Sequence, residues 1–513
     1  MISQAPARKG RRRRTAEADT PVRKVDYRNL RNPFPRMRLF SDDQVQAIHE
    51  DALHVLENLG IKILLPEARA LFRAAGARAD DDDMVFIGRD IVSETLKTAP
   101  GSFTLTCANP ERNITYEPGA LIFMAGAGAP HATDLIRGRR PGTNQNFREL
   151  IQIVQHFDVL PILGPSVEPQ DVPIHLRHYA FMDAQLTLSD KFPFIYARGT
   201  QQAEQCFEML MDFHDIAEAA FRDNPHTYTI INTNSPRQID VPMAQGLIDF
   251  ARWGQMSIVT PFTLMGAMAP ITVAGALVLS HAEALAAIAL TQLAKPGAPV
   301  SYGTFTSNVD MKSGAPIFGT PEHFRASVGA GQLADLIGLP WRSAAGSAAN
   351  LGDAQGANEN QFGIWGNLLA GATVIVHAAG WLEGGLTVSY EKIITDLEVL
   401  QSVAELCVPT PADDAARGLS ALAEVQPGGH FFGATHTMER YQTEFYAPLV
   451  HDFANHGTWE DRGGEDATQR ATAIWQQILT EDARPATDPA KLEALQAYIA
   501  RKTTEGGAPP LGG

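Results

Sequence analysis

Short apolar runs alternate with longer amphipathic stretches through the middle of the chain. Eight of these runs are too short for helices and rich in β-branched and aromatic residues, a pattern typical of strands buried on both faces. They cover residues 160–165, 193–198, 227–233, 257–263, 299–305, 341–346, 373–379 and 429–435. Stretches between them, such as 274–293 and 321–337, have the pattern of helices. Eight strands that alternate with helices predict an α/β fold of the (β/α)8 TIM barrel type, with a doubly wound open sheet as the alternative.

The residues ahead of these strands, 39–155, predict an N-terminal α+β region. Ser41 and Gln44 have the spacing of a capping box at the start of a first helix. Two further short helices are expected at 66–75 and 90–98. Three β-type segments within 102–124, separated by Asn-Pro and Pro-Gly turns, predict a small antiparallel sheet. The loop that follows contains Gly-Ala-Gly at 126–128, which is typical of a tight turn because no dinucleotide-binding strand and helix flank it.

Three further regions complete the predicted organisation. The TIM barrel is expected to span 156–455, and 456–513 is expected to hold charged amphipathic helices and a flexible end. Residues 1–38 form a basic tail that contains the cluster RKGRRRR at Arg8–Arg14. Such a segment is typical of a disordered, solvated tail, with binding to nucleic acid or to an acidic partner as the alternative.

Charge and composition narrow the partners that the folded body can have. The formal net charge is −16, which argues against nucleic acid. No apolar run approaches the ~20 residues of a membrane span and no hydrophobic signal segment follows the arginines, so we expect a cytoplasmic protein. The three cysteines, Cys107, Cys206 and Cys407, belong to no Cys/His cluster, so we expect no bound metal. The large barrel with its long terminal helices favours a homo-oligomer.

The carboxyl ends of barrel strands meet around one cavity, where the active sites of this fold lie. The predicted strand ends bring mainly aromatic side chains to this cavity and few carboxylates. The substrate-binding candidates are Trp381, Phe305, Phe262, Tyr302, Tyr196, Phe432 and Arg198. Ring faces attract a quaternary ammonium with about 0.5–2 kcal/mol each, and they need no hydrogen bond to its nitrogen. The set predicts a pocket for such a cation, although each ring taken singly is more typical of barrel core.

Two polar residues after the seventh predicted strand are the catalytic candidates. His377 directly follows the apolar run, and Glu383 lies six residues further on. Glu383 is expected to orient His377 or to lie near the cation, with a helix cap or a pair with arginine as the alternatives. Three histidines, His377, His430 and His436, are possible metal ligands, but the H-x5-H spacing of His430 and His436 fits no standard site. No predicted strand contains a lysine, which argues against Schiff-base chemistry.

Several segments resemble a known family. They are RLFSDDQVQAIHEDALHVLENLGIKI, GAPHATDL, GTNQNF, DAQGANENQ and HAAGWLEGGLTVSYEK. They are similar to the trimethylamine methyltransferase family, from Arg38 to Thr480. The resemblance implies a TIM barrel that passes a methyl group from a methylated amine to the cobalt of a corrinoid (cobalamin), carried by a separate partner protein or free. The candidates for contacts with this cofactor are Gly384, Gly385, His430 and His436.

The substrate implied by the resemblance depends on the branch of the family. The founding branch uses pyrrolysine, a residue that does not occur in this sequence. The chain is therefore similar to the pyrrolysine-free branch, whose best-known activity is glycine betaine:corrinoid methyl transfer. Carnitine, proline betaine and dimethylsulfoniopropionate are alternative methyl donors. A non-catalytic betaine-binding protein and a lyase or isomerase without corrinoid are alternatives of a different class.

The chemistry of a quaternary amine explains why no special residue is required. Such an amine leaves as a neutral tertiary amine, so no proton has to be supplied. A strong anionic clamp would stabilise the substrate more than the transition state, because the positive charge on nitrogen disappears. Aromatic contacts that aim one methyl group at the acceptor are better suited. The candidates for binding a betaine carboxylate are Arg198, Lys312, Asn232, Asn234 and the backbone amides of Gly384 and Gly385.

Overall fold

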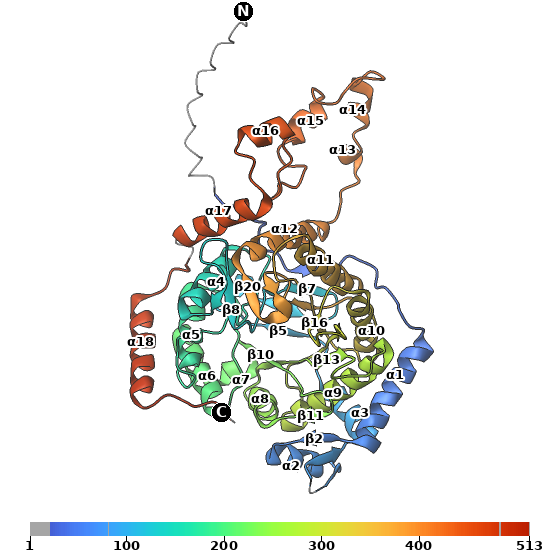
Figure 1. The fold of residues 1–513 in the computed structure, drawn as a ribbon, viewed down its shortest axis with the longest axis vertical. Helices are drawn as coiled ribbons and strands as arrows, with labels where there is room; N and C mark the ends of the chain where they lie inside the picture. Colours follow the sequence, from blue (N-terminus) through green and yellow to red (C-terminus); the bar gives the residue numbers. More distant parts are fainter. Residues whose placement is uncertain (1–20, 81, 482–483, 512–513) are drawn as a thin grey trace, which may run out of the picture.

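The protein has a mixed α/β fold in which parallel strands lie inside a layer of helices (Figure 1). The computed structural model describes residues 21–80, 82–481 and 484–511, so the basic cluster Arg8–Arg14 lies outside the described residues. The central sheet has the order β1 (Leu30–Arg31), β7 (Ala120–Phe123), β18 (Val374–Val376), β17 (Trp341–Ala344), β14 (Val300–Gly303), β12 (Met256–Val259) and β10 (Tyr228–Ile231). All neighbours from β7 to β10 are parallel, and β1 is antiparallel to β7.

Two isolated parallel bridges extend this sheet beyond β10. One joins Phe194 to Tyr228, and the other joins Ile162 to Phe192. Seven of the eight predicted strands therefore contain paired backbone, five of them as named strands of the central sheet and two as these bridges.

Helices cover the outside of the sheet and follow its strands along the chain. They are α4 (Asn144–His156), α5 (Arg177–Leu188), α6 (Thr200–His214), α7 (Glu218–Asp223), α8 (Val241–Arg252), α9 (Val273–Ala294), α10 (Pro321–Ile337), α11 (Ala354–Leu369) and α12 (Tyr390–Leu406). Contrary to the expectation from the sequence, α9 is long and apolar enough for a membrane span. However, 78% of its most apolar window is buried inside the protein, between helices such as α8 and α10, as expected of a core helix.

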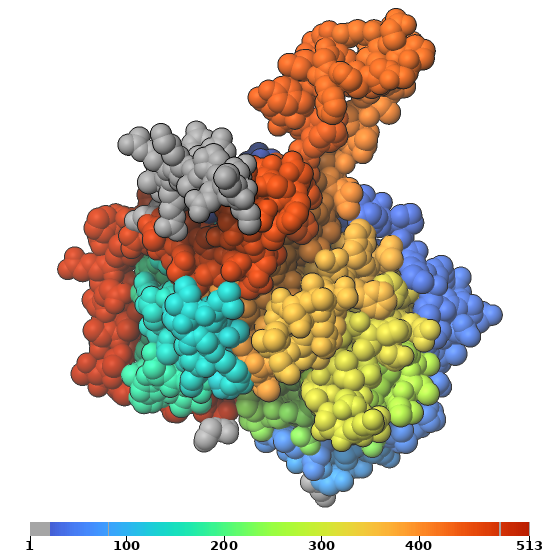
Figure 2. Space-filling model, turned by 45° about the horizontal axis from the view of Figure 1, so that its top comes forward, coloured from blue at the N-terminus to red at the C-terminus, as the bar shows by residue number. Residues whose placement is uncertain are grey.

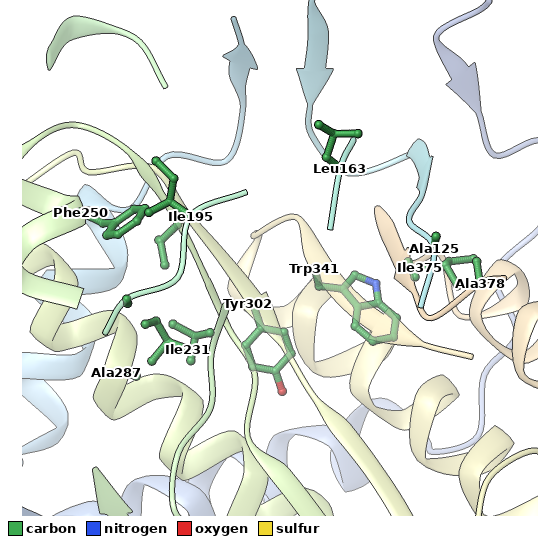
Figure 3. Close-up of a cluster of buried hydrophobic side chains, with 14 of the residues drawn as sticks. Ala125, Leu163, Ile195, Ile231, Phe250, Ala287, Tyr302, Trp341, Ile375 and Ala378 are labelled. Carbon is green, nitrogen blue, oxygen red and sulfur yellow. The ribbon is translucent and has the colours of Figure 1, made fainter. Parts of the chain in front are cut away.

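Both faces of the central strands are apolar. Figure 3 shows members of the helix-facing cluster from successive segments, namely Leu163, Ile195, Ile231, Tyr302, Trp341 and Ile375. The neighbouring positions Val374 and Val376 point to the opposite face and join a second cluster with Ile122 and Ile258. This burial on both faces explains why the strands form continuous apolar runs in the sequence.

The N-terminal region begins as predicted. Ser41 and Gln44 form a complete capping box at the start of α1 (Asp42–His54), which continues as the π-helical turn Val55–Leu59. The other two predicted helices are α2 (Pro66–Ala74) and α3 (Arg89–Thr98). A small sheet beside them has the order β11 (Gln238–Ile239), β2 (Ile61–Ile63), β4 (Met84–Phe86) and β3 (Arg78–Ala79).

The antiparallel sheet predicted at 102–124 is correct only in part. β5 (Phe103–Leu105) and β6 (Ile114–Tyr116) form a hairpin around the 3-10 helix Pro110–Arg112 and pack into the second apolar cluster. β7 instead pairs in parallel with β18, where the eighth predicted strand was expected. Its four residues are all buried, as suits a strand with apolar neighbours on both faces. Ordered structure also begins before residue 39, because β1 pairs with β7.

A projecting arm carries the segment that was predicted as the eighth strand. Residues 408–449 extend away from the body (Figures 1 and 2) and contain α13 (Asp414–Arg417), α14 (Leu419–Glu424) and α15 (Thr435–Arg440). Residues 429–435 form no strand, so this prediction is wrong. Three glycines in and beside the segment weaken a strand, and Phe432 is 81% exposed. The chain continues through α16 (His456–Asp461), α17 (Ala467–Thr480) and α18 (Pro489–Thr504), and α17 packs on α12.

Two smaller sheets lie beyond the carboxyl ends of the central strands. β13 (Phe262–Met265) follows β12 and pairs in parallel with β15 (Phe305–Val309), which follows β14 and is antiparallel to β16 (Pro316–Ile317). The other sheet has the order β19 (Trp381–Leu382), β20 (Thr387–Ser389), β8 (His131–Thr133) and β9 (Arg140–Pro141), with the 3-10 turn Glu383–Gly385 between β19 and β20.

Candidate functional site

A cavity of about 560 Å³ lies at the carboxyl ends of the parallel strands and is open to solvent on one side. Residues within or shortly after β7, β10, β12, β14, β17 and β18 contribute to its wall. The structure brings eight of the predicted site residues together here, namely His377, Trp381, Phe305, Phe262, Tyr196, Arg198, Gly384 and Gly385. This is the position at which α/β proteins of this kind bind their ligands.

The imidazole of His377 stacks on the indole of Trp381 at the wall of the cavity. The ring centroids are 4.2 Å apart and the planes differ by 17°. Both rings are held by the backbone of Ala127: its amide donates to His377 Nδ1 at 3.2 Å, and its carbonyl accepts from Trp381 Nε1 at 3.2 Å. The Gly-Ala-Gly segment, predicted as a tight turn, thus fixes two predicted site residues.

Three glycines surround the indole of Trp381. A Cβ atom added at Gly346 would lie 2.3 Å from Trp381 Cε3, and one added at Gly385 would lie 2.4 Å from Cζ2. A Cβ at Gly126 would lie 3.2 Å from Cδ1. The bulk of the indole therefore depends on the absence of side chains at these positions, and the glycines after Glu383 provide space as well as backbone amides.

Phe305 lies at the centre of the ring group. Its centroid is 5.1 Å from Phe262, 5.4 Å from His377 and 5.7 Å from Trp381. Phe318, which the sequence analysis did not single out, stacks on Phe305 with 4.9 Å between the ring centroids and is fully buried. The rings thus form one connected group that comes from β13, β15 and the segments after β16 and β18.

His377 is strained and uncharged. Its φ of 57° lies in the left-handed region, which costs a residue with a side chain roughly 1–2 kcal/mol. Burial, together with the nearby positive charge of Arg342, lowers its pKa well below 6.5. Because Nδ1 accepts from the Ala127 amide, the neutral ring carries its proton on Nε2. His377 therefore offers the cavity a neutral ring and does not repel a cation.

Arg342 is a site residue that the sequence analysis missed. It lies in β17, lines the cavity and is 2% exposed. Its Cζ is 5.2 Å from the Phe305 ring centroid. Burial lowers its pKa to about 9, so the guanidinium stays charged at neutral pH. The signal was an arginine inside a run predicted to be buried on both faces, where an unpaired charge is rare.

The remaining charges of the wall lie nearer the rim. The Arg198 guanidinium lies 3.9 Å from the Tyr196 ring centroid and forms an ion pair with Glu168. Among the described lining residues the one carboxylate belongs to Asp240, which caps α8 by accepting from the Met243 amide at 2.8 Å. The cavity wall is therefore poor in free negative charge.

Besides Lys312, a candidate for the substrate carboxylate, five predicted site residues do not line the cavity. Tyr302 is buried on the helix-facing side of β14, where its hydroxyl contacts His281 Nδ1 at 3.0 Å. Phe432, His430 and His436 lie on the projecting arm because residues 429–435 form no strand there. The expectation that these four residues converge on the strand ends is wrong.

The fifth is Glu383, whose carboxylate is bound by arginine rather than by His377. Arg139 Nε and Nη2 each donate to it at 2.9 Å. Burial opposes its ionisation, but hydrogen bonds from Arg139 and Thr387 outweigh burial and lower its pKa. The alternative of a pair with arginine is the one that the structure shows. Within the described parts of the chain, no group of three or more His, Cys, Asp or Glu side chains is arranged to hold a metal ion.

A ring-walled cavity at the ends of parallel strands, inside a layer of helices, is the arrangement of an α/β enzyme. The chain belongs to the trimethylamine methyltransferase family, whose family model matches residues 7–507. The resemblance found in the sequence is thereby confirmed.

Individual relatives cover nearly the whole chain. A glycine betaine methyltransferase of Desulfitobacterium hafniense is 33% identical over 476 residues, which cover 92% of this chain and 99% of the relative. A trimethylamine methyltransferase of the same species is 29% identical, covering 91% of this chain and 94% of the relative. The crystal structure of the monomethylamine methyltransferase of Methanosarcina barkeri shares 10% identity and covers 90% of this chain and 95% of that chain, with a TM-score of 0.45.

Proposed function

We propose that the protein transfers a methyl group from glycine betaine to the cobalt of a corrinoid carried by a partner protein, without pyrrolysine. Family membership supports methyl transfer, and the similarity to a glycine betaine methyltransferase supports the substrate. The observation that carries the proposal is the connected ring group of His377, Trp381, Phe305 and Phe262 in the wall of one open cavity.

The ring group suits a methyl donor that is a quaternary amine. Its faces bind the cation through contacts of about 0.5–2 kcal/mol each. These contacts hold the substrate without the strong anionic partner that would favour the ground state over the transition state. His377 is neutral, and the amine leaves as a neutral product, so no residue of the wall has to move a proton. The task of the wall is to aim one methyl group at the open side of the cavity.

The open side of the cavity fits the approach of a bulky cofactor. Leu386 at its edge is 53% exposed, and Ile271 and Met311 on the loops after β13 and β15 are 68% and 65% exposed. Ile271 and Met311 lie close to each other beside Gly266, and exposed apolar side chains that gather in this way mark a surface for a partner. We propose these three residues as contacts for the corrinoid, which supplies the methyl-accepting cobalt when bound.

We further propose that the parallel strands form a TIM barrel with β7 as its first strand. The pairing of β18 with β7 and the two bridges beyond β10 support this proposal. A hydrogen bond between the segment after β7 and the segment after Ile162 also supports it, because the Gly128 amide donates to the Pro165 carbonyl at 2.7 Å.

A methyl-donor panel tests the proposed function. The purified protein is mixed with free Co(I)-cobalamin and one donor, and methylation of the cobalamin is followed by its absorbance. Glycine betaine is expected to react, with proline betaine, carnitine, dimethylsulfoniopropionate and trimethylamine as comparisons and a reaction without protein as the control. Reaction with trimethylamine but with none of the betaines would refute the proposed substrate.

A further inference from the structure

The buried guanidinium of Arg342 is only partly satisfied by hydrogen bonds. Its guanidinium donates to the Thr304 carbonyl at 3.4 Å, and its Nε has no hydrogen-bond partner. No carboxylate in the described parts of the chain forms an ion pair with it. A buried charge without a partner is costly and rare in folded proteins. Its presence in the wall of a cavity points to a ligand that supplies the missing anion.

The position of Arg342 relative to the rings narrows the chemistry of that ligand. Its guanidinium carbon is 5.2 Å from the centroid of Phe305, the ring that contacts Phe262, His377 and Trp381. The cavity therefore presents a cation-binding ring group and an anion-binding guanidinium side by side. A small molecule that carries both charges close together complements the two features at once.

We propose that Arg342 binds the carboxylate of the substrate and thereby selects zwitterionic quaternary amines over cations that lack an acid group. This inference rests on the proposed function, because it concerns the same cavity. One methylene separates the ammonium from the carboxylate in glycine betaine, so an ammonium placed on the rings brings its carboxylate to the neighbouring guanidinium. Guanidinium and carboxylate groups can form two parallel charge-assisted hydrogen bonds.

The positive charge of Arg342 also disfavours the binding of cations that lack a carboxylate. A donor such as tetramethylammonium or choline has a positive charge and no carboxylate, and it meets a buried positive charge beside the rings. Selection therefore combines attraction of the zwitterion with repulsion of the simple cation. The orientation of the substrate is also fixed, because its carboxylate is held at β17 while its ammonium end lies at the rings.

Arg198, which the sequence analysis favoured for the carboxylate, provides the matched comparison. Its guanidinium already has an ion-pair partner in Glu168 and a ring contact with Tyr196. Glu168 also pairs with Arg177 at 3.1 Å, so the charges at the rim are shared in a network. Replacing Arg198 removes a positive charge near the same cavity without removing the unpaired one.

Binding measured by titration calorimetry without cobalamin tests the inference. Glycine betaine and tetramethylammonium are titrated into the wild type and into Arg342→Gln, Arg342→Lys and Arg198→Gln. The wild type is expected to bind glycine betaine at least about tenfold more tightly than tetramethylammonium. Arg342→Gln should weaken glycine betaine binding by about 10–100-fold and leave tetramethylammonium binding unchanged or stronger. Arg342→Lys should retain part of the preference, because the charge remains but the fork of donors is lost.

Three results would overturn the inference. They are equal wild-type affinity for the two ligands, an equal loss of both ligands in a folded Arg342→Gln protein, and a selective loss of glycine betaine only in Arg198→Gln. The first needs no variant, so it decides the question even if Arg342→Gln fails to fold. Because cobalamin is absent, a failure of methyl transfer in the donor panel refutes the proposed function separately from this binding result.

Discussion

The position of the Trp381 indole depends on Gly346, and replacing this glycine with alanine tests the proposed role of the ring group. The added Cβ atom would lie 2.3 Å from Trp381 Cε3 and 2.9 Å from Cζ3. Carbon atoms pack best at about 3.5–4.0 Å, so the indole has to move by about 1 Å or more. Gly385 and Gly126 lie against other edges of the same ring system, so little space remains for this movement.

The expected loss of activity follows from the displacement. A misplacement of about 1 Å at a site that works by positioning can cost about 10²-fold, and loss of one ring contact alone costs about 0.5–2 kcal/mol. We therefore expect Gly346→Ala to lower kcat/KM for glycine betaine by about 10–100-fold. The φ of Gly346 is 102°, so alanine there also strains the backbone by roughly 1–2 kcal/mol.

The assay is the initial rate of cobalamin methylation at several glycine betaine concentrations, with thermal unfolding measured in parallel. Gly352→Ala is the matched control on the same segment, because its Cβ would meet only Lys392 Cβ at 3.6 Å, an ordinary contact. It should retain wild-type kcat/KM. A folded Gly346→Ala protein with wild-type kcat/KM would show that the placement of the indole does not matter for the reaction.

Three further predictions concern the ring group, the buried histidines and the arm. Trp381→Ala should raise the KM for glycine betaine by about 2–30-fold, and Trp381→Phe should raise it by less because phenylalanine keeps a ring. Equal KM values in the wild type and the two variants would contradict this. Burial lowers the pKa of His178 and of His323 from 6.5 to about 4. Below pH 6.5 the unfolded chain takes up protons on these histidines before the folded protein does. Each histidine should therefore lower the free energy of unfolding by about 1.4 kcal/mol for each pH unit between pH 6.5 and about pH 4. A urea midpoint that is equal at pH 7 and pH 5.5 would refute this. Phe432→Ser on the arm should leave the rate of methylation of free cobalamin unchanged. A tenfold loss of that rate would show that the arm contributes to the active site.

The strands that bear the site were predictable because burial on both faces leaves a clear signal. Val374–Val376 and Val300–Gly303 are continuous runs of buried residues, and their short length and their β-branched and aromatic content located them. The prediction of an eighth strand at 429–435 is wrong, because β7 pairs with β18 at the position expected of that strand. β7 was assigned to the antiparallel sheet of its sequence neighbours, although its partner β18 lies some 250 residues away in the chain. Pairing over that separation leaves no local pattern in the sequence.

Site residues that follow the ends of strands were predictable from the sequence. Residues within strands were not, because the direction of the side chain decides whether they reach the cavity. His377, Trp381 and Phe305 follow directly from the positions of strand ends, and the structure brings them together. Tyr302 and Arg342 both lie within strands, and alternation decides which of them faces the cavity. A shift of one residue exchanges the two faces of a strand, so assigning a role to either residue required the register of the sheet.

The loop after β18 shows why positioning, rather than proton transfer, is the chemistry that this cavity favours. Its strained residue His377 is followed by backbone that two side chains hold in place. Asn360 donates to the Ala378 carbonyl at 2.9 Å, and Asp396 accepts from the Gly380 amide at 2.8 Å. Asp396 is itself paired with Lys392 at 2.8 Å, in a buried ion pair on α12.

These supports hold the stacked rings in place, and none of them leaves a carboxylate free to act as a base at the rings. A loop that had to deliver or accept a proton would present a titratable group with a pKa near neutrality. Here the imidazole is kept neutral by burial, and the carboxylate of Glu383 is committed to Arg139. These contacts therefore offset the backbone strain at His377 and hold the surface formed by the rings in a fixed position. A reaction that depends on the orientation of one methyl group requires such a fixed surface.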